Sequence, residues 1–198
     1  MDRSELQELH YITPICNLPS ILQHGVLSHA RAAALPHESV AMQEMQDRRA
    51  SIRVPGGRSL HEYSNLYICG RNPMLYKRRD RHSELCVLQI SADVLDLPNV
   101  VITDRNAGGR GDYAQFRPSP SGLRIVDRSL TFAEYWTSPD QIDYWRRKAA
   151  KCAEVLVPDR VEPRFVRGAY VSCDQAKAAL EALNTRLTVT VDRHLFFL

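Results

Sequence analysis

The chain has 198 residues, a formal net charge of +3, 44% hydrophobic and 25% charged residues, a composition that is typical of folded globular proteins and excludes disordered and fibrous classes. No run approaches the ~20 apolar residues that span a bilayer, and the first segment, MDRSELQELHYIT, lacks the apolar core of a secretory signal. We therefore predict a cytoplasmic protein with no membrane partner and a single domain over residues 1–198.

Short strands and helices alternate in the first half of the chain. Asn17 is a predicted N-cap, Pro19 suits a first helical turn and Gly25 is a predicted stop, so a short helix is expected between them. In chain order we expect a strand over 9–13, a helix over 17–24, a helix over 39–50, a strand over 65–69, a helical turn over 73–79 and a strand over 84–91.

The second half begins with a strand over 99–103 and a long loop over 105–124, which contains four glycines and two prolines. Ser138 is a predicted helix cap. In chain order we then expect a helix over 139–151, strands over 153–157 and 164–172, a helix over 174–183 and a closing strand over 186–198. Because this order has no regular βαβ rhythm and no GxGxxG or P-loop motif, we predict an α+β fold with antiparallel pairing.

The cysteines and histidines give no sign of a metal site or a disulfide framework. The five cysteines are an odd number and none are spaced as CxxC, and the histidines show neither HExxH nor HxH spacing. Cys69, Cys86 and Cys152 lie in apolar runs, where cysteine acts as a small core residue. We therefore predict buried, inert thiols and no bound metal.

Basic residues are concentrated in one part of the chain. The 26 basic residues comprise 22 Arg and only 4 Lys, and residues 48–81 contain nine of them against two acidic residues. Arginine suits bidentate phosphate contacts and stacking on bases. The stretch therefore predicts a phosphate-rich partner, with a solvated loop face as the alternative.

Glu154 stands out because the other residues of its predicted strand, AEVLV, are apolar. Strand alternation places Glu154 and Leu156 on one face. Such a carboxylate either forms a structural ion pair with an arginine or is displayed in a cleft. In a cleft it can stabilise a developing positive charge or accept a proton.

Two further groups of residues have both a structural and a functional interpretation. Arg48 and Arg49 close the helix predicted over 39–50, where they complement the helix dipole or clamp a diphosphate. Thr13 and Asn17 are expected to lie close to the N-terminus of the helix predicted over 17–24. Their presence there is explained by helix capping or by binding of an anionic or amide-bearing ligand.

Five motifs occur in a characteristic order: YITPICNLPSILQHGVL, DRRASIRV, NLYICGRNPMLYK, LCVLQISADVLDLPNVVITDRNA and AEVLVP. Over residues 9–172 this series resembles the DarT-type nucleic-acid ADP-ribosyltransferases, toxins of bacterial toxin–antitoxin and phage-defence systems. The resemblance implies an α+β core of two packed, mainly antiparallel sheets flanked by helices around an NAD cleft. It also implies that NAD is consumed as substrate and that ADP-ribose is attached to a base of single-stranded DNA.

The resemblance also implies roles for individual residues. Glu154 and Arg49 are the expected catalytic pair, with Arg48 as the alternative arginine. NAD contacts are expected from Tyr11, Thr13, Asn17, Arg48, Met74, Tyr76, Asp104 and Asn106, and contacts with the strand from Arg71, Arg78, Tyr144, Trp145, Arg146 and Arg147. A cognate antitoxin with an ADP-ribosylglycohydrolase macrodomain is the expected protein partner.

The sequence departs from the thymine-modifying members at one motif position. Those members usually carry a histidine where Pro14 stands, and often another where Tyr11 stands. Pro14 offers neither a ring nitrogen nor a backbone N–H. The modified base is therefore left open between thymine and guanine, and RNA is an alternative acceptor.

In the implied reaction the bond between nicotinamide and ribose breaks through an oxocarbenium-like state. Glu154 would hold a ribose hydroxyl and take a proton from the attacking base, and Arg49 would orient the diphosphate or the base. A base in a duplex is out of reach, so a single strand is expected. The alternatives are a transferase acting on RNA or another acceptor, and a catalytically silent nucleic-acid-binding module in which Glu154 forms a structural ion pair.

Overall fold

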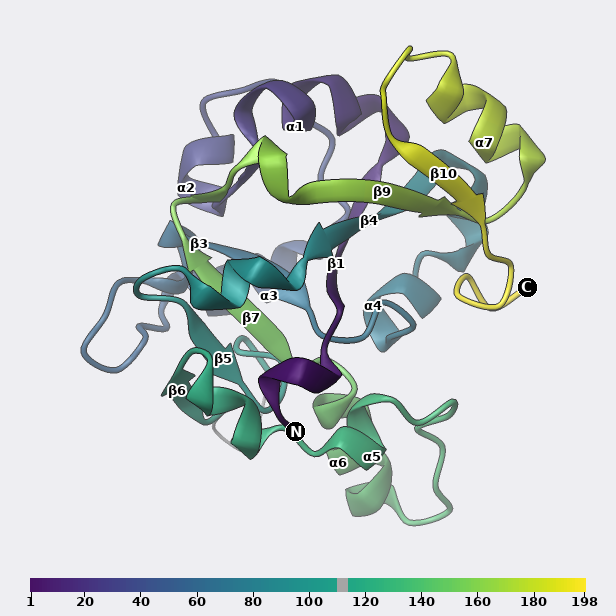
Figure 1. Ribbon diagram of the computed structural model, residues 1–198. Coiled ribbons are helices and arrows are strands. Elements are labelled where there is room, and N and C mark those ends of the chain that lie inside the picture. Colours follow the sequence, from purple (N-terminus) through teal and green to yellow (C-terminus); the bar gives the residue numbers. More distant parts are fainter. Residues whose placement is uncertain (110–113) are drawn as a thin grey trace.

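A computed structural model describes residues 1–109 and 114–198 (Figure 1). In this part of the chain, eight strands form one sheet in the order β10-β9-β4-β1-β3-β7-β5-β6, and β2 pairs with β8. The strands are β1 Glu8–Pro14, β2 Val26–Leu27, β3 Tyr63–Tyr67, β4 Leu85–Ser91, β5 Val101–Thr103, β6 Phe116–Pro118, β7 Glu154–Pro158, β8 Arg160–Val161, β9 Val166–Val171 and β10 Thr188–Val191. The helices are α1 Leu18–His24, α2 His29–Ala32, α3 Gln43–Ala50, α4 Pro73–Tyr76, α5 Arg128–Thr131, α6 Gln141–Ala150 and α7 Asp174–Glu181.

The main sheet consists of two four-stranded halves that meet at β1 and β3. These two strands pair at one position, His10 with Tyr67. In contrast, β1 pairs with β4 along its whole length, and β3 pairs with β7 from Tyr63 to Tyr67. In Figure 1 the half containing β9 and β10 therefore turns away from the half containing β5 and β6. In the part of the chain that the structure describes, the two sheets expected from the family resemblance are thus joined into one through this single position.

The α+β class and the mainly antiparallel pairing are confirmed, with one exception at the C-terminal end. β9 and β10 pair in parallel, from Gly168 with Thr188 to Val171 with Val191. Parallel neighbours need a crossover connection, and α7 supplies it. This segment is therefore a single βαβ unit in a chain without a regular βαβ rhythm.

The main hydrophobic core lies on one face of β7, the strand that contains Glu154. Val155 and Val157 of β7 pack in the largest apolar cluster, whereas Leu156 packs in a separate cluster on the other face. The predicted alternation of β7 is thus confirmed. Cys69, Cys86 and Cys152 are buried, as predicted, and burial raises the pKa of the Cys86 and Cys152 thiols to about 12.

Of the two predicted helix caps, Asn17 occupies the N-cap position of α1, whereas Ser138 is not the N-cap of α6. The Asn17 side chain makes no capping hydrogen bond to α1, because its amide is bonded to Glu38. Helix α6 begins two residues later than expected, and its N-cap is Asp140 rather than Ser138. The Asp140 carboxylate accepts a hydrogen bond from the Asp143 N–H at 2.7 Å, and hydrogen bonds to an ionised acceptor are stronger than neutral ones.

Three predicted boundaries also move. Helix α3 begins at Gln43, not at residue 39. The long loop predicted over 105–124 contains β6, because Phe116 pairs with Thr103 of β5. The closing strand ends at Val191. In the described residues every helix is too short or too polar to cross a membrane.

Candidate active site

A cavity of about 1050 Å³ opens where β1 and β3 part. Residues 11–14 of β1 and Asn65 and Tyr67 of β3 line its floor, and parts of α3, α4 and α6 line its walls. Volumes of ~300–1,000 Å³ are typical of ligand sites. The gap between the two half-sheets is therefore large enough for a dinucleotide.

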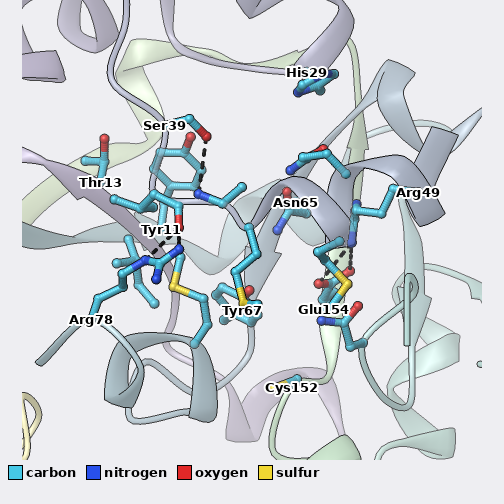
Figure 2. A pocket seen from close by; sticks show the side chains of 18 of the residues that line it. Tyr11, Thr13, His29, Ser39, Arg49, Asn65, Tyr67, Arg78, Cys152 and Glu154 are labelled. Carbon is cyan, nitrogen blue, oxygen red and sulfur yellow. Dashed lines mark hydrogen bonds and ion pairs between the residues drawn. The ribbon is translucent and has the colours of Figure 1, made fainter. Parts of the chain in front are cut away.

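Glu154 lies in the wall of this cavity and is the first residue of β7. It pairs with Tyr67 of β3 on one side and Thr103 of β5 on the other. Its side chain is fully buried, with 0% exposure. The carboxylate accepts hydrogen bonds from Arg49 Nη1 at 3.3 and 3.1 Å (Figure 2). It also accepts one from the Ala107 N–H at 3.4 Å.

Arg49 reaches Glu154 from the last turn of α3. Its side chain is buried, and Nη2 has no hydrogen-bond partner among the described residues. Close packing against Gly108 permits this position, because a Cβ added to Gly108 would lie 2.6 Å from Arg49 Cγ. The sequence left open whether Glu154 is ion-paired or displayed in a cleft, and the structure shows a buried ion pair in the wall of the cavity.

A loop over residues 33–42 forms the roof of the cavity, and we call it the roof loop. The Asn17 amide donates to the Glu38 carbonyl at 2.7 Å and accepts from the Glu38 N–H at 3.0 Å. Two nitrogens of Arg78 donate to the Val40 carbonyl at 2.9 and 2.7 Å, a contact seen on the left of Figure 2. Asn17 and Arg78 line the cavity, and both are engaged in holding the roof loop.

A third attachment of the roof loop is ionic. Arg81 hydrogen bonds to the Glu38 carboxylate, which holds the pKa of Glu38 below its usual value. Arg81 also pairs with Glu84. In the same basic stretch, Arg58 pairs with Asp159 at 2.8 Å. Acidic residues that lie outside the stretch 48–81 in the sequence therefore neutralise part of its excess positive charge.

Helix α6 forms an exposed wall of the cavity. Trp145 lines the cavity with 61% of its side chain exposed, and Arg146 lies beside it. Asp143 pairs with both Arg147, at 2.5 Å, and Arg146, at 3.0 Å. Hydrogen bonds from Arg147 and then Arg146 lower the pKa of Asp143 to about 2.

Comparison with known proteins identifies the family. The profile described as "ssDNA thymidine ADP-ribosyltransferase, DarT" matches residues 10–197. The chain belongs to the DarT family. A "DNA ADP-ribosyl transferase-DNA ADP-ribosyl glycohydrolase fusion protein" of Thermosipho africanus is 32% identical over 202 residues. That match covers 97% of this chain and 50% of the relative, so the chain spans about half of the fusion protein.

Three further matches are one protein of Thermus sp. 2.9 and two solved structures. The Thermus "DNA ADP-ribosyl transferase" is 31% identical over 75% of this chain and 73% of its own. The structure titled "Thermus sp. 2.9 DarT in complex with ADP-ribosylated ssDNA" aligns with a TM-score of 0.82, 26% identity and 97% coverage of both chains. "Thermosipho africanus DarTG in complex with ADP-ribose" aligns with a TM-score of 0.81 and 31% identity, over 97% of this chain and 51% of that one.

Most residues predicted for the DarT-type site come together in the cavity. Of the sixteen predicted residues, the eleven that line it are Tyr11, Thr13, Asn17, Arg48, Arg49, Met74, Arg78, Asn106, Trp145, Arg146 and Glu154. The five that do not are Arg71, Tyr76, Asp104, Tyr144 and Arg147. Pro14 also lines the cavity, at the end of β1.

The five outlying residues have other contacts. Tyr76 packs edge-on against Trp136 and Phe197, and the Arg71 guanidinium lies over the Phe197 ring at 3.9 Å. The Tyr144 hydroxyl accepts a hydrogen bond from Lys148 at 3.2 Å.

Asp104 is occupied by its own loop. Its carboxylate pairs with Arg105 at 2.8 Å and accepts a hydrogen bond from the Gln115 N–H at 2.8 Å. Arg147 is paired with Asp143 on α6.

Sequence reasoning missed several polar residues of the cavity, His29, Asn65 and Tyr67 among them. Asn65 and Tyr67 lie two residues apart on β3 and share the face of Glu154. A polar residue in an apolar strand is the signal that identified Glu154, and Asn65 carries it too. Burial and the nearby Glu154 charge raise the pKa of Tyr67 well above its ordinary value.

His29 lines the cavity and contacts another histidine. Its ring lies 4.2 Å from the His61 ring. Burial, and then the charges of His61, His37 and Arg49, lower the pKa of His29. Within the described residues, no cluster of three His, Cys, Asp or Glu side chains is placed to hold a metal ion.

Proposed function

We propose that this chain is an NAD-consuming mono-ADP-ribosyltransferase that attaches ADP-ribose to a thymine or guanine base of single-stranded DNA, through one domain over residues 1–198. The Glu154 carboxylate, held by Arg49 in the wall of a dinucleotide-sized cavity, carries this proposal. Membership of the DarT family supports it. The Thermus sp. 2.9 relative has been solved with NAD+ and with ADP-ribosylated single-stranded DNA, which supports both substrates.

The cavity fits the donor substrate in size and in chemistry. Arg49 Nη2 is a buried cationic donor with no partner among the described residues, and a buried donor without a partner is costly unless a ligand satisfies it. A diphosphate or a ribose oxygen would satisfy it. Tyr11, Thr13, Arg48, Met74 and Asn106 would line the bound NAD, while Asn17 would act by holding the roof loop.

Glu154 would have two tasks. When bound, NAD supplies a ribose carbon whose bond to nicotinamide breaks with the electron pair leaving on nicotinamide. The Glu154 carboxylate would hold a ribose hydroxyl and stabilise the positive charge that develops on the sugar. It would then take the proton from the attacking base nitrogen. Arg49 would keep the carboxylate in place through Nη1.

The strand would enter along the exposed wall formed by α6. Trp145 offers a ring for base stacking and Arg146 offers a guanidinium for phosphate, both at the cavity edge. The remaining predicted strand contacts, Arg71, Tyr144 and Arg147, lie outside the cavity and would act only on a longer strand.

We also propose that the chain acts as the toxin of a toxin–antitoxin pair. The Thermosipho africanus relative joins a transferase to a DNA ADP-ribosyl glycohydrolase in one protein, which supports an enzyme of that activity as the antitoxin. A macrodomain in that antitoxin, a role in phage defence and a cytoplasmic location stay predictions.

The test is transfer of label from NAD to single-stranded DNA, with RNA as the parallel acceptor and mass spectrometry of the nucleosides to identify the modified base. Glu154→Gln keeps the shape of the side chain and should lower transfer by about 10²–10⁴-fold. Glu162→Gln is the matched control, because Glu162 pairs with Arg164 at 2.9 Å outside the cavity.

Each other outcome contradicts part of the proposal. Full activity of Glu154→Gln would remove this residue from the mechanism. Labelled RNA without labelled DNA would change the acceptor. Oligonucleotide binding without loss of NAD would indicate a silent binding module.

A further inference from the structure

We propose that Asn65 is a specificity-determining residue that donates a hydrogen bond from its side-chain amide to a carbonyl oxygen of the acceptor base, next to the attacking ring nitrogen. This inference rests on the proposed function and extends it to the chemistry of the base. It assigns a role to a residue that the sequence motifs did not single out.

The position of Asn65 follows from strand register. Asn65 of β3 pairs with Leu156 of β7, and Tyr67 pairs with Glu154. Residues two apart on a strand share a face, so Asn65 lies on the Glu154 face of the sheet. It lines the cavity and is only partly buried. In Figure 2 Asn65 lies between Tyr67 and Arg49, on the same side of the cavity as Glu154.

The Asn65 amide has no hydrogen-bond partner among the described residues, and the Gln46 Oε1 in the cavity wall has none either, whereas three other amides are engaged. Asn17 is bonded to Glu38, Asn106 accepts from the Gly108 N–H, and Asn72 caps α4. No hydrogen bond of the Asn65 side chain occurs among residues 1–109 and 114–198. A carboxamide with both its donor and its acceptor unused can recognise a base edge.

A second free donor lies beside the same carboxylate. Arg49 is 95% buried, since its exposure is 5%, and its Nη2 has no partner among the described residues. Two unused hydrogen-bond donors therefore lie on the same side of the cavity as the Glu154 carboxylate. One is Arg49 Nη2 on α3, and the other is the Asn65 amide on β3. Two donors near one carboxylate suit a group that carries a proton flanked by oxygen atoms.

Thymine and guanine present such a group, and cytosine and adenine do not. The ring N–H of thymine lies between two carbonyls, and that of guanine lies next to one. When Glu154 takes this proton, the nitrogen electron pair forms the bond to the ribose carbon, and the negative charge that develops spreads onto the carbonyl oxygens. A donor fixed at a carbonyl stabilises this charge. Cytosine and adenine have no ring proton for Glu154 to take.

The test compares Asn65→Ala and Asn65→Ser with Gln43→Ala. Gln43 lies on α3, bonds to Asp47 at 2.8 Å and does not line the cavity, so it is a matched amide control. The measurements are kcat/KM for oligonucleotides with one reactive base, KM for NAD, and NAD hydrolysis without an oligonucleotide. We expect the Asn65 variants to lose about 10- to 100-fold in kcat/KM for the oligonucleotide, with both NAD quantities within about twofold of the wild type.

A base analogue separates recognition from a structural effect. Replacement of each thymine carbonyl in turn by a thiocarbonyl, or of the guanine carbonyl where guanine is the modified base, weakens the acceptor that Asn65 would bind. At one such position the analogue should lower the activity of the wild type. It should lower the already reduced activity of Asn65→Ala only slightly further. Equal losses in both proteins at every position would overturn the proposal.

The remaining outcomes separate this inference from the proposed function. A raised KM for NAD with unchanged kcat/KM for the oligonucleotide would place Asn65 in the donor site and overturn the inference alone. A wild-type protein that consumes NAD but labels no nucleic acid would overturn the proposed function, a result that does not depend on the Asn65 variants.

Discussion

Arg49 contacts Glu154 through one guanidinium nitrogen only. Nη1 lies 3.3 and 3.1 Å from the two carboxylate oxygens, while Nη2 is buried and has no partner in the described residues. An arginine that serves a purely structural ion pair commonly uses two nitrogens in a fork. Half of this guanidinium is therefore available to a ligand, which favours a site over a structural pair.

Gly108→Ala should disturb this contact. The new Cβ would lie 2.6 Å from Arg49 Cγ and 3.3 Å from the Met45 sulfur, so the arginine must shift away from Glu154. We expect a loss of about 1–3 kcal/mol in the free energy of unfolding and a loss of transfer of at least tenfold. Urea unfolding and initial rates measure the two. Gly122→Ala, whose Cβ would lie 2.8 Å from Arg117 Cβ outside the cavity, is the control; an equal loss of transfer in both variants would contradict a local effect on Arg49.

Asn17→Ala should release the roof loop. The variant loses both hydrogen bonds to Glu38, worth about 0.5–1.5 kcal/mol each. The expected results are faster amide exchange at residue 38 and a KM for NAD raised by about 5- to 30-fold, because binding must then order the loop. Unchanged exchange at this amide would show that Arg78 and Arg81 hold the loop without Asn17.

Asp143→Asn should strengthen oligonucleotide binding. Asp143 engages Arg146 and Arg147, and with a pKa of about 2 it stays negative under all ordinary assay conditions. Removal of this charge frees both guanidinium groups for phosphate, so affinity should rise by about 2- to 5-fold and its dependence on salt should steepen. Fluorescence anisotropy across a salt series is the measurement, and Asp174→Asn on α7 is the control. A salt slope equal to that of the wild type would exclude these arginines as phosphate contacts.

The contact of His29 with His61 predicts that the stability of the folded protein depends on pH. Burial, and then the charges of His61, His37 and Arg49, lower the pKa of His29 in the folded state. The unfolded chain therefore binds the proton more readily, so the contribution to stability is full above about pH 6.5 and is lost as the pH falls through the lowered value. The thermal midpoints of wild type and His29→Gln should keep a constant difference above pH 6.5. Below it the wild type should lose more; parallel curves down to pH 5 would contradict this.

The catalytic face could be predicted from sequence because it depends on local pattern. A lone carboxylate in the apolar strand AEVLV identified Glu154, and alternation placed Leu156 beside it, as the structure has it. The same pattern applied to NLYIC would have identified Asn65. The roof loop could not be predicted, because Asn17 and Arg78 bind backbone atoms at residues 38 and 40, which side-chain patterns do not encode.

Two errors at α4 and in the basic stretch have geometric causes. Met74 faces the cavity but Tyr76 does not, because two residues of helix turn a side chain by about 200°. Arg58 and Arg81 were counted as free charge, yet Asp159 and Glu38 neutralise them from distant parts of the chain. Local charge counts overlook partners that only folding brings together.

The single paired position between β1 and β3 has a consequence for stability. Among the described residues, His10 and Tyr67 are the one backbone pair that joins the half-sheets, and the cavity lies beside it. A ligand bound in this cavity would contact both half-sheets and hold them together. Since ligands that bind only the folded chain stabilise it by mass action, the thermal midpoint of unfolding would report how much of the cavity is occupied by ligand.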